Sequence, residues 1–410
     1  VAAATPSAGN VIGFAYDGTT RKLFVSVNGT YINSGDPVAG TGQVATLSAS
    51  YTWLPAVTDA TTQVISVNFG QRSFNTSPPS GYSALSTANF ATPSIVKPGA
   101  QFDVDTYTGT GATRSKTGLG FQPDLVWFKG RSGATDHAIY DSVRGVQKDI
   151  ASNTAAAETT QSTGLTAFNS DGYTTGTLAK LNTSAATYAA WMWKKGVTPG
   201  VDIVTGTKAS TNETFSHSLG TTPHFMIVKS RGSGSGNGLV YHRSGNASPQ
   251  NGGLVLELTS AFASNAGYWN NTAPTPSQFT LGSFTPNNTF VVYLFAEVAG
   301  FSRFGSYTGN GSADGPFVHC GFRPRWIVVK RTDASNDWHI FDTARNTANL
   351  TNLAVYADLS NAEATETNNV FDLLSNGFKI RGTGLGVNAS GGTYIFAAFA
   401  EFPFKSSNAR

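Results

Sequence analysis

One motif returns about every hundred residues along the chain, and it constrains the fold more than any other feature. In each copy a Gly-x-x-Pro turn leads into a hydrophobic run that ends in Lys; the copies begin at Gly120, Gly220 and Gly321. The units also end alike, on apolar runs rich in aromatic and β-branched residues, at 187–196, 289–297 and 393–401. A period of this length is the size of a domain and not of a solenoid repeat. The pattern therefore predicts tandem modules, each closed by a final β-strand.

The composition favours an all-β protein built from β-sandwich modules. Charged residues make up only 12% of the 410 residues, glycine is frequent, and short apolar runs alternate with polar turn residues. A chain of this length exceeds one ordinary core. We therefore expect four domains, at 1–100, 101–200, 201–299 and 300–410, and we call the last three modules 1, 2 and 3. A short helix is expected in long connections such as 153–158.

Charge and cysteine content narrow the possible partners. A net charge of +3, without a cluster of basic residues, gives no electrostatic footprint for nucleic acid. No apolar run approaches the length of a membrane span, so membrane insertion is not expected. The single Cys320 is expected to be a buried thiol. Because the sequence begins at Val1 and not at Met, we expect it to be processed or part of a longer chain.

The first hundred residues alternate strand-like runs with turn signals. Residues 11–17 and 22–30 predict two antiparallel strands, and Asn28-Gly29 is a strong hairpin signal. Residues 51–57 and 64–74 predict two more strands.

These runs carry a resemblance to a known family. Val-Ile-Gly-Phe-Ala-Tyr-Asp, Lys-Leu-Phe-Val-Ser-Val-Asn-Gly-Thr, Leu-Pro-Ala-Val and Val-Asn-Phe-Gly-Gln-Arg-Ser-Phe, in this order, resemble the second half of a SPRY domain. The resemblance implies a concanavalin-like β-sandwich used in protein recognition, covering about residues 9–90. The first half of that fold is absent here, so either the chain extends further or another chain completes the sandwich. An incomplete sandwich would expose a sheet edge and an apolar face.

The modules resemble tail and fibre proteins of marine bacteriophages, in which partial SPRY-like segments often precede such repeats. The resemblance rests on Gly-Phe-Gln-Pro-Asp-Leu-Val-Trp-Phe-Lys at 120–129, on Ser-Asp-Gly-Tyr at 170–173 and on the ending at 396–410. It implies a bacteriophage virion protein. Module 2 departs most, because Tyr241-His242-Arg243 stands where the other modules have Asp-x-x-Arg.

The Asp-x-x-Arg pairs, Asp141 with Arg144 and Asp342 with Arg345, have two interpretations. A guanidinium and a carboxylate could grip a ligand together. The alternative, which we favour, is an internal salt bridge that fixes a turn. The motif lysines, Lys129, Lys229 and Lys330, are expected to be solvated or hydrogen-bonded to turns.

Signals for catalysis and for metals are weak. The glutamates lack the paired arrangement that glycoside hydrolysis needs, and the six histidines lack the close spacing of a zinc site. An acidic loop at 333–337 lacks the calcium-loop pattern and is expected to be an exposed turn. We therefore expect neither a catalytic residue, a metal nor a cofactor.

Aromatic residues outside the predicted strands are the candidate ligand-binding residues. They lie beside amides and acids, a combination that suits stacking on a sugar; the set is Tyr268, Trp269, Asn270, Asp337 and Trp338. The alternative interpretation is that the rings cap a sandwich core.

The expected function, which depends largely on the resemblance, is that of a non-enzymatic virion component at the particle surface. A tail fibre or receptor-binding protein that recognises a host glycan or protein comes first, a capsid-decorating protein second and a polysaccharide-degrading tail enzyme third. The expected partners are other virion subunits and a host receptor. A homo-oligomer is expected, a trimer if the protein is a fibre.

Overall fold

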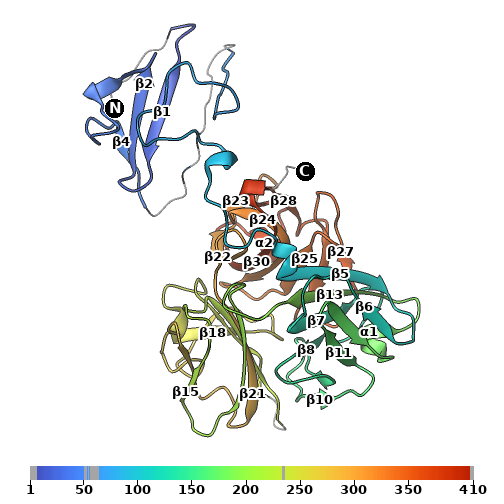
Figure 1. Cartoon of the computed structure of the whole chain (residues 1–410). Helices are drawn as coiled ribbons and strands as arrows, with labels where there is room; N and C mark the ends of the chain where they lie inside the picture. Colours follow the sequence, from blue (N-terminus) through green and yellow to red (C-terminus); the bar gives the residue numbers. More distant parts are fainter. Residues whose placement is uncertain (1–6, 50–52, 54, 56–63, 233–235, 407–410) are drawn as a thin grey trace. The chain divides into compact units, whose positions relative to one another are not determined.

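The computed structural model describes residues 7–49, 53, 55, 64–232 and 236–406. In these residues the protein is all-β, with antiparallel sheets and two α-helices of four residues each. Short 3-10 turns are η1 (Ile32–Ser34), η2 (Thr87–Asn89), η3 (Pro98–Ala100), η4 (Pro249–Asn251) and η5 (Phe404–Ser406). The chain divides into two compact units, residues 1–91 and 92–410 (Figure 1).

The first unit is built on one small antiparallel sheet. Its strands are β1 (Ile12–Asp17), β2 (Lys22–Val27), β3 (Thr30–Tyr31) and β4 (Ala45–Thr46). β1, β3 and β4 all pair with β2. Asn28 and Gly29 adopt φ angles of 50° and 87°, as a two-residue hairpin turn requires, so the predicted hairpin is confirmed and it divides the run at 22–30 into β2 and β3.

One face of this sheet is apolar and not buried. Side chains alternate between the two faces of a strand, so β1 and β2 place six apolar residues on the same face: Ile12, Phe14, Tyr16, Leu23, Val25 and Val27. Phe14 is 66% exposed. Among the described residues, β1 pairs only with β2 and its other edge is free. Such a face and edge are what the sequence predicts for an incomplete sandwich.

The predicted strand at 64–74 is wrong. The hydrogen bonds of this segment are local, as when the amide of Asn68 donates to the carbonyl of Arg72. Val64 is 94% exposed. An apolar alternation forms a strand only where a neighbouring strand takes up its backbone N–H and C=O groups. Most of the strand predicted at 51–57 lies outside the described residues.

Each module of the second unit has a main sheet and a smaller one. In module 1 the strands of the main sheet, in spatial order, are β5 (Phe102–Thr108), β13 (Thr187–Trp193), β7 (Leu125–Gly130) and β8 (Ala138–Asp141). In module 2 they are β14 (Val201–Thr207), β21 (Thr289–Phe295), β16 (Phe225–Ser230), β17 (Leu239–His242), β18 (Gly252–Val255) and β19 (Ala263–Ser264). In module 3 they are β22 (Ser302–Thr308), β30 (Thr393–Pro403), β24 (Phe322–Arg331), β25 (Trp338–Asp342), β26 (Leu353–Tyr356) and β27 (Ala364–Thr365). The smaller sheets are β11 (Leu165–Asn169), β12 (Gly172–Thr175) and β6 (Arg114–Lys116); β15 (Glu213–Ser216) and β20 (Gln278–Leu281); and β23 (Phe317–His319), β29 (Gly377–Ile380) and β28 (Phe371–Leu374). In module 1, β9 (Lys148–Asp149) and β10 (Thr159–Thr160) form a further pair.

The main sheets share one order: the first strand of the module, then its last strand, then the motif strand. The expected short helix at 153–158 is not formed. The helices are instead α1 (Ala179–Asn182) and α2 (Leu385–Asn388), each directly before the last strand. Residues 153–158 run without helix because their backbone and side chains contact module 2, as shown below.

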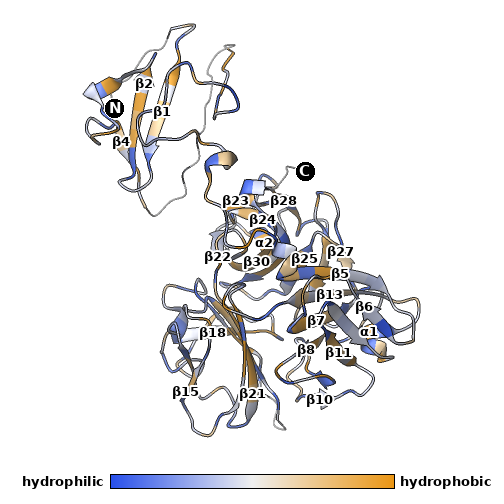
Figure 2. Ribbon diagram, in the orientation of Figure 1, coloured by the Kyte–Doolittle hydropathy of each residue, from blue (hydrophilic) through white to orange (hydrophobic). Residues whose placement is uncertain are grey.

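The last strands are apolar throughout because both of their faces are buried. In β13, Tyr188, Ala190 and Met192 lie in the core of module 1. The alternate residues Ala189, Trp191 and Trp193 lie in a second core. A strand buried on both faces reads as a continuous hydrophobic run and not as an alternating one. Figure 2 shows this hydrophobic character along β21 and β30.

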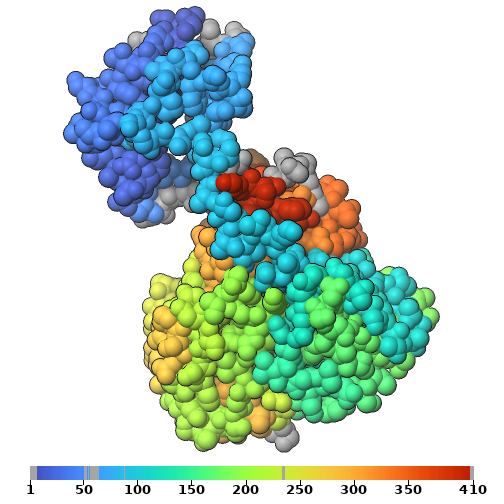
Figure 3. All heavy atoms as spheres, viewed as in Figure 1, coloured from blue at the N-terminus to red at the C-terminus, as the bar shows by residue number. Residues whose placement is uncertain are grey.

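The second core is common to the three modules. It joins Trp193 of module 1, Phe295 of module 2 and Phe399 of module 3. The modules therefore form one compact unit around a shared centre, and not separate domains in a row (Figures 1 and 3). Cys320 is buried, as predicted.

Candidate functional site

The motif lysines lie in the interfaces between modules, which we call seams. Each Nζ donates a hydrogen bond to a backbone carbonyl of the neighbouring module: Lys129 to Ser360 at 2.9 Å, Lys229 to Thr154 at 2.7 Å and Lys330 to Thr259 at 2.9 Å. The direction is cyclic, from module 1 to 3, from 3 to 2 and from 2 to 1. All three side chains are fully buried, so they are not solvated; of the two expectations, hydrogen bonding is the one that fits, with the acceptors in connecting segments of the neighbouring module. Burial lowers the pKa of Lys129 and of Lys330 to about 8.

The Asp-x-x-Arg pairs also lie in seams. Asp141 accepts a hydrogen bond from Arg144 in its own module and, at 2.9 Å, from the hydroxyl of Tyr293 in module 2. The side chains of both ion-paired residues are fully buried. The favoured interpretation as an internal salt bridge therefore agrees with the geometry, and neither group is open to a ligand.

The same arrangement recurs at the seam between modules 3 and 1. Asp342 accepts from Arg345 at 2.6 Å and from Nε1 of Trp191, in module 1, at 3.0 Å. Burial acts to raise the pKa of Asp342, but Arg345 outweighs it and holds the pKa below its usual value.

Two glutamates extend these ion pairs across the seams. Glu158 binds Arg144 of its own module at 3.0 Å and Arg231 of module 2 at 2.8 Å. Glu363 in module 3 does the same with Arg345 at 3.1 Å and Arg131 of module 1 at 2.8 Å. Each seam of this kind therefore holds two guanidinium groups around two carboxylates, and the buried charges are paired, as their burial requires.

The seam between modules 2 and 3 has no aspartate at this place, although Glu297 of module 2 pairs with Arg303 of module 3 across it at 2.6 Å. At the place of the aspartate stands His242, whose ring lies against the backbone carbonyl of Phe396 at 3.0 Å. The module 3 residue that corresponds to Trp191 and Tyr293 is Ala397, which has no side-chain donor to satisfy. Nδ1 of His242 accepts from the N–H of Ser244, so Nε2 carries the proton and donates. Burial lowers the pKa of His242 to about 3 and keeps the ring neutral.

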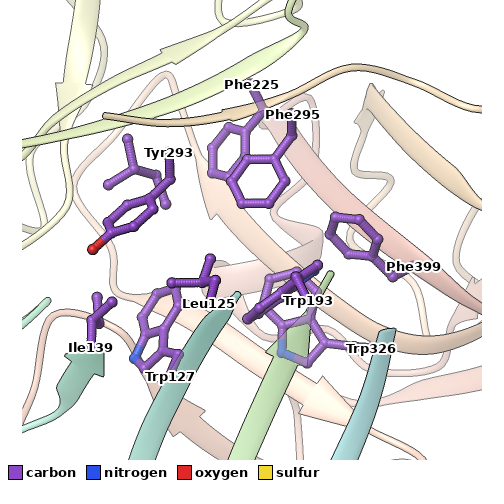
Figure 4. A pocket seen from close by; sticks show the side chains of 10 residues that line it. Leu125, Trp127, Ile139, Trp193, Phe225, Tyr293, Phe295, Trp326 and Phe399 are labelled. Carbon is purple, nitrogen blue, oxygen red and sulfur yellow. The ribbon is translucent and has the colours of Figure 1, made fainter. Parts of the chain in front are cut away.

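A small cavity lies where the three modules meet. Its volume is about 20 Å³, and its lining is wholly apolar: Leu125, Trp127, Ile139, Trp193, Phe225, Ile227, Tyr293, Phe295, Trp326 and Phe399 (Figure 4). This space holds about one water molecule, and water needs two to four polar partners. The cavity is therefore a dry packing defect and not a ligand site.

A larger, open groove of about 480 Å³ lies at the seam between modules 3 and 1. We call it the seam groove; it is lined by Val96, Lys97, Pro98, Gly99, Ala100, Phe102, Asp103, Leu119, Arg325, Ala400, Glu401 and Phe402. Arg325 pairs with Asp103 across the seam at 3.0 Å. The groove has the volume of a small-molecule site, yet its central charges neutralise one another, so it favours neither anions nor cations.

The candidate ligand-binding aromatics lie in cores. Trp269 is 1% exposed, and its Nε1 donates to the carbonyl of Gly252 at 2.8 Å, while Tyr268 packs beside it. Trp338 is 1% exposed and donates to Val255 in module 2 at 3.1 Å. No ring face of the three is open to a sugar in this structure, so the alternative interpretation, core packing, fits their burial.

The two polar candidates, Asn270 and Asp337, are at least partly exposed, whereas the aromatic rings next to them in the sequence are buried. Asn270 is exposed and has a φ of 52° in a turn, and Asp337 is half-buried. The structure does not bring the two clusters together into one site: Trp269 lies in the core of module 2, and Trp338 in the core shared by the modules.

Sequence reasoning missed the glutamates at 158 and 363 and the role of His242. The glutamates follow their Asp-x-x-Arg motifs at different distances, 17 and 21 residues after the aspartate, so no fixed spacing marks them. For His242, the one available signal was its position at the place of the aspartate.

Within the described ranges, no group of three or more His, Cys, Asp or Glu side chains is placed to hold a metal ion. In the same part of the chain, no helix is long and apolar enough to cross a membrane.

The geometry defines a class of protein: a single chain in which three related β-sandwich modules surround one core, with the repeated polar residues at the seams. The chain belongs to the family described as a domain of unknown function, DUF7483, whose model matches residues 97–403. This match begins just before β5 and ends with β30, so it spans all three modules. A search of curated proteins finds no match.

Proposed function

We propose that the protein is a non-enzymatic component of a bacteriophage virion. The first candidate within this class is a tail fibre or receptor-binding protein that contacts the host surface. The observation that supports this best is the use of the repeated polar residues. Lys129, Asp141 and Glu158 and their counterparts hold modules together and do not converge on an open cleft. A rigid body of packed β-sandwiches suits a role in attachment or architecture. Its partners would be other virion subunits and a host glycan or protein.

A capsid-decorating protein is the second candidate. One observation favours it: a single chain already makes a three-module body, whereas fibres are commonly made from three chains. Both candidates share a location on the outside of the particle.

Labelling with an antibody against residues 92–410 on intact particles tests both candidates. Label on tail appendages supports the fibre, and label over the capsid supports decoration. Particles that carry no label, from a lysate in which the protein is abundant, would reject both.

A polysaccharide-degrading tail enzyme is the third candidate, and a glycan panel separates it from the other two. Incubation with host capsular and cell-wall polysaccharides should release no reducing ends. Their release by the wild-type protein would favour the enzyme.

A further inference from the structure

The seams follow one rotational order. The motif lysine of each module donates to the next module in a single direction, and no module receives a lysine from the module to which it donates its own. An interface that joins two different surfaces head to tail gives either an open filament or a closed ring. Here the third step returns to module 1, so the modules form a closed ring of three.

Backbone hydrogen bonds join the same pairs of modules in the same cyclic arrangement, with donation in the opposite direction. The N–H of Glu363 donates to Arg131 at 2.9 Å, that of Glu158 to Arg231 at 3.1 Å and that of Phe262 to Thr332 at 2.8 Å. Each module thus uses the surface with its motif lysine once and the surface that receives a lysine once. Among the described residues, no copy of either surface remains to receive a fourth module.

The likeness of the modules extends beyond the seams to exposed turns. In module 1 the N–H of Thr110 donates to the side chain of Asn182 at 2.7 Å. In module 3 the N–H of Asn310 donates to the side chain of Asn388 at 2.9 Å. Thr110 and Asn310 are both exposed. Modules 1 and 3 therefore present a similar exposed turn, whereas module 2, in its described residues, has no helix directly before its last strand.

We propose that one copy of this chain occupies a threefold position where other proteins would place three copies, so that its partner is a threefold-symmetric protein assembly. This inference rests on the proposed virion function. A threefold partner is the natural match because its three equivalent sites can each meet a similar module. A single chain that has closed its own ring has no seam left through which it would trimerise.

A disulfide across the closing seam tests ring closure in the full-length chain. Thr135 and Ser360 are joined by a backbone hydrogen bond of 2.8 Å between modules 1 and 3. The double variant Thr135→Cys, Ser360→Cys should form a bond within one chain. Under non-reducing conditions it should run as one chain with altered mobility, and sedimentation should give the mass of one chain, 42.9 kDa. Thr135→Cys alone is the matched control. Disulfide-linked dimers or trimers, or a sedimenting species of three chains, would overturn the proposal.

Counting on the particle tests the partner. Quantitative mass spectrometry of purified particles should give one copy of this chain for every three copies of the threefold partner at its site. Three copies per site would reject the inference and leave the virion function standing. Absence from the particle would reject the virion function, and with it the partner, while the disulfide result would still decide whether the ring closes within one chain.

Discussion

Asp342 offers a direct test of the buried ion pairs at the seams. Its carboxylate accepts from Arg345 and from Trp191, and the side chains of Asp342 and Arg345 have no solvent exposure. Asp342→Asn keeps the shape and removes the charge. Removal of one partner of a buried ion pair destabilises a protein by about 3 to 5 kcal/mol. Arg345 keeps Glu363 at 3.1 Å, so we expect the lower end, about 3 kcal/mol.

This loss should be visible in both equilibrium and thermal unfolding. For a unit of the size of residues 92–410, 3 kcal/mol corresponds to a fall in Tm of roughly 4 to 5 °C. Urea unfolding followed by tryptophan fluorescence gives the free energy directly. The emission of Trp191 should also shift, because its indole N–H loses a charged acceptor.

Asp372→Asn is the matched control. Asp372 pairs with Arg381 at 2.9 Å in the same module, but Arg381 is 47% exposed. A surface pair of this kind contributes less than about 1 kcal/mol. Equal losses in the two variants, within about 0.5 kcal/mol, would show that the seam carboxylate does not act as a buried charge, and the reasoning would fail.

Three further predictions concern pH and backbone space. The pKa of His242 is about 3 in the folded protein, below its ordinary value of 6.5, so the unfolded chain takes up the proton first as the pH falls. The free energy of unfolding should therefore fall by about 2 kcal/mol from pH 7 to pH 5. His242→Gln should remove this contribution of about 2 kcal/mol, as measured by urea unfolding at the two pH values. The pKa of Lys330 is about 8 in the folded protein, below its ordinary value of 10.5, so the unfolded chain again binds the proton more tightly, here between pH 8 and pH 10. The free energy of unfolding should therefore rise from pH 8 to pH 10, and Lys330→Met should make this rise smaller by about 2 kcal/mol. A Cβ at Gly109 would lie 2.2 Å from the carbonyl oxygen of Thr183, whereas one at Gly120 meets no atom within 4 Å. Gly109→Ala should therefore prevent soluble expression or lower Tm strongly, and Gly120→Ala should cost only about 1 kcal/mol, from its φ of 73°.

The elements that sequence predicted well are those whose cause is local. The Gly-x-x-Pro turn and the apolar run after it depend on neighbours in the chain, so the motif strands and the last strands were visible as patterns. The apolar run of a last strand does not reveal, however, that its two faces belong to different cores. In β13 two sets of alternate residues face two different cores, and periodicity cannot say that the second core belongs to other modules.

The roles of the polar residues could not be predicted because their partners are distant in the chain. Arg131 and Glu363 are 232 residues apart. The burial of Trp269 depends on its contact with the backbone of Gly252, across a turn that the sequence marks only as polar. An aromatic residue outside a predicted strand gives the same sequence pattern whether its ring binds a ligand or packs in the core. Only the packing of the module separates them.

The long reach between Arg131 and Glu363 also affects how the protein is made. Ribosomes add about 5 to 20 residues per second, so Arg131 emerges roughly 10 to 50 s before its partner exists. In the later part of that interval Trp191 and Trp193 of module 1 already exist, but the rings of Trp326 and Phe399 in module 3, which later pack on them, are still missing or unfolded. The nascent chain therefore carries a partly uncovered aromatic patch until module 3 has been made, and a chaperone that shields it would act before then.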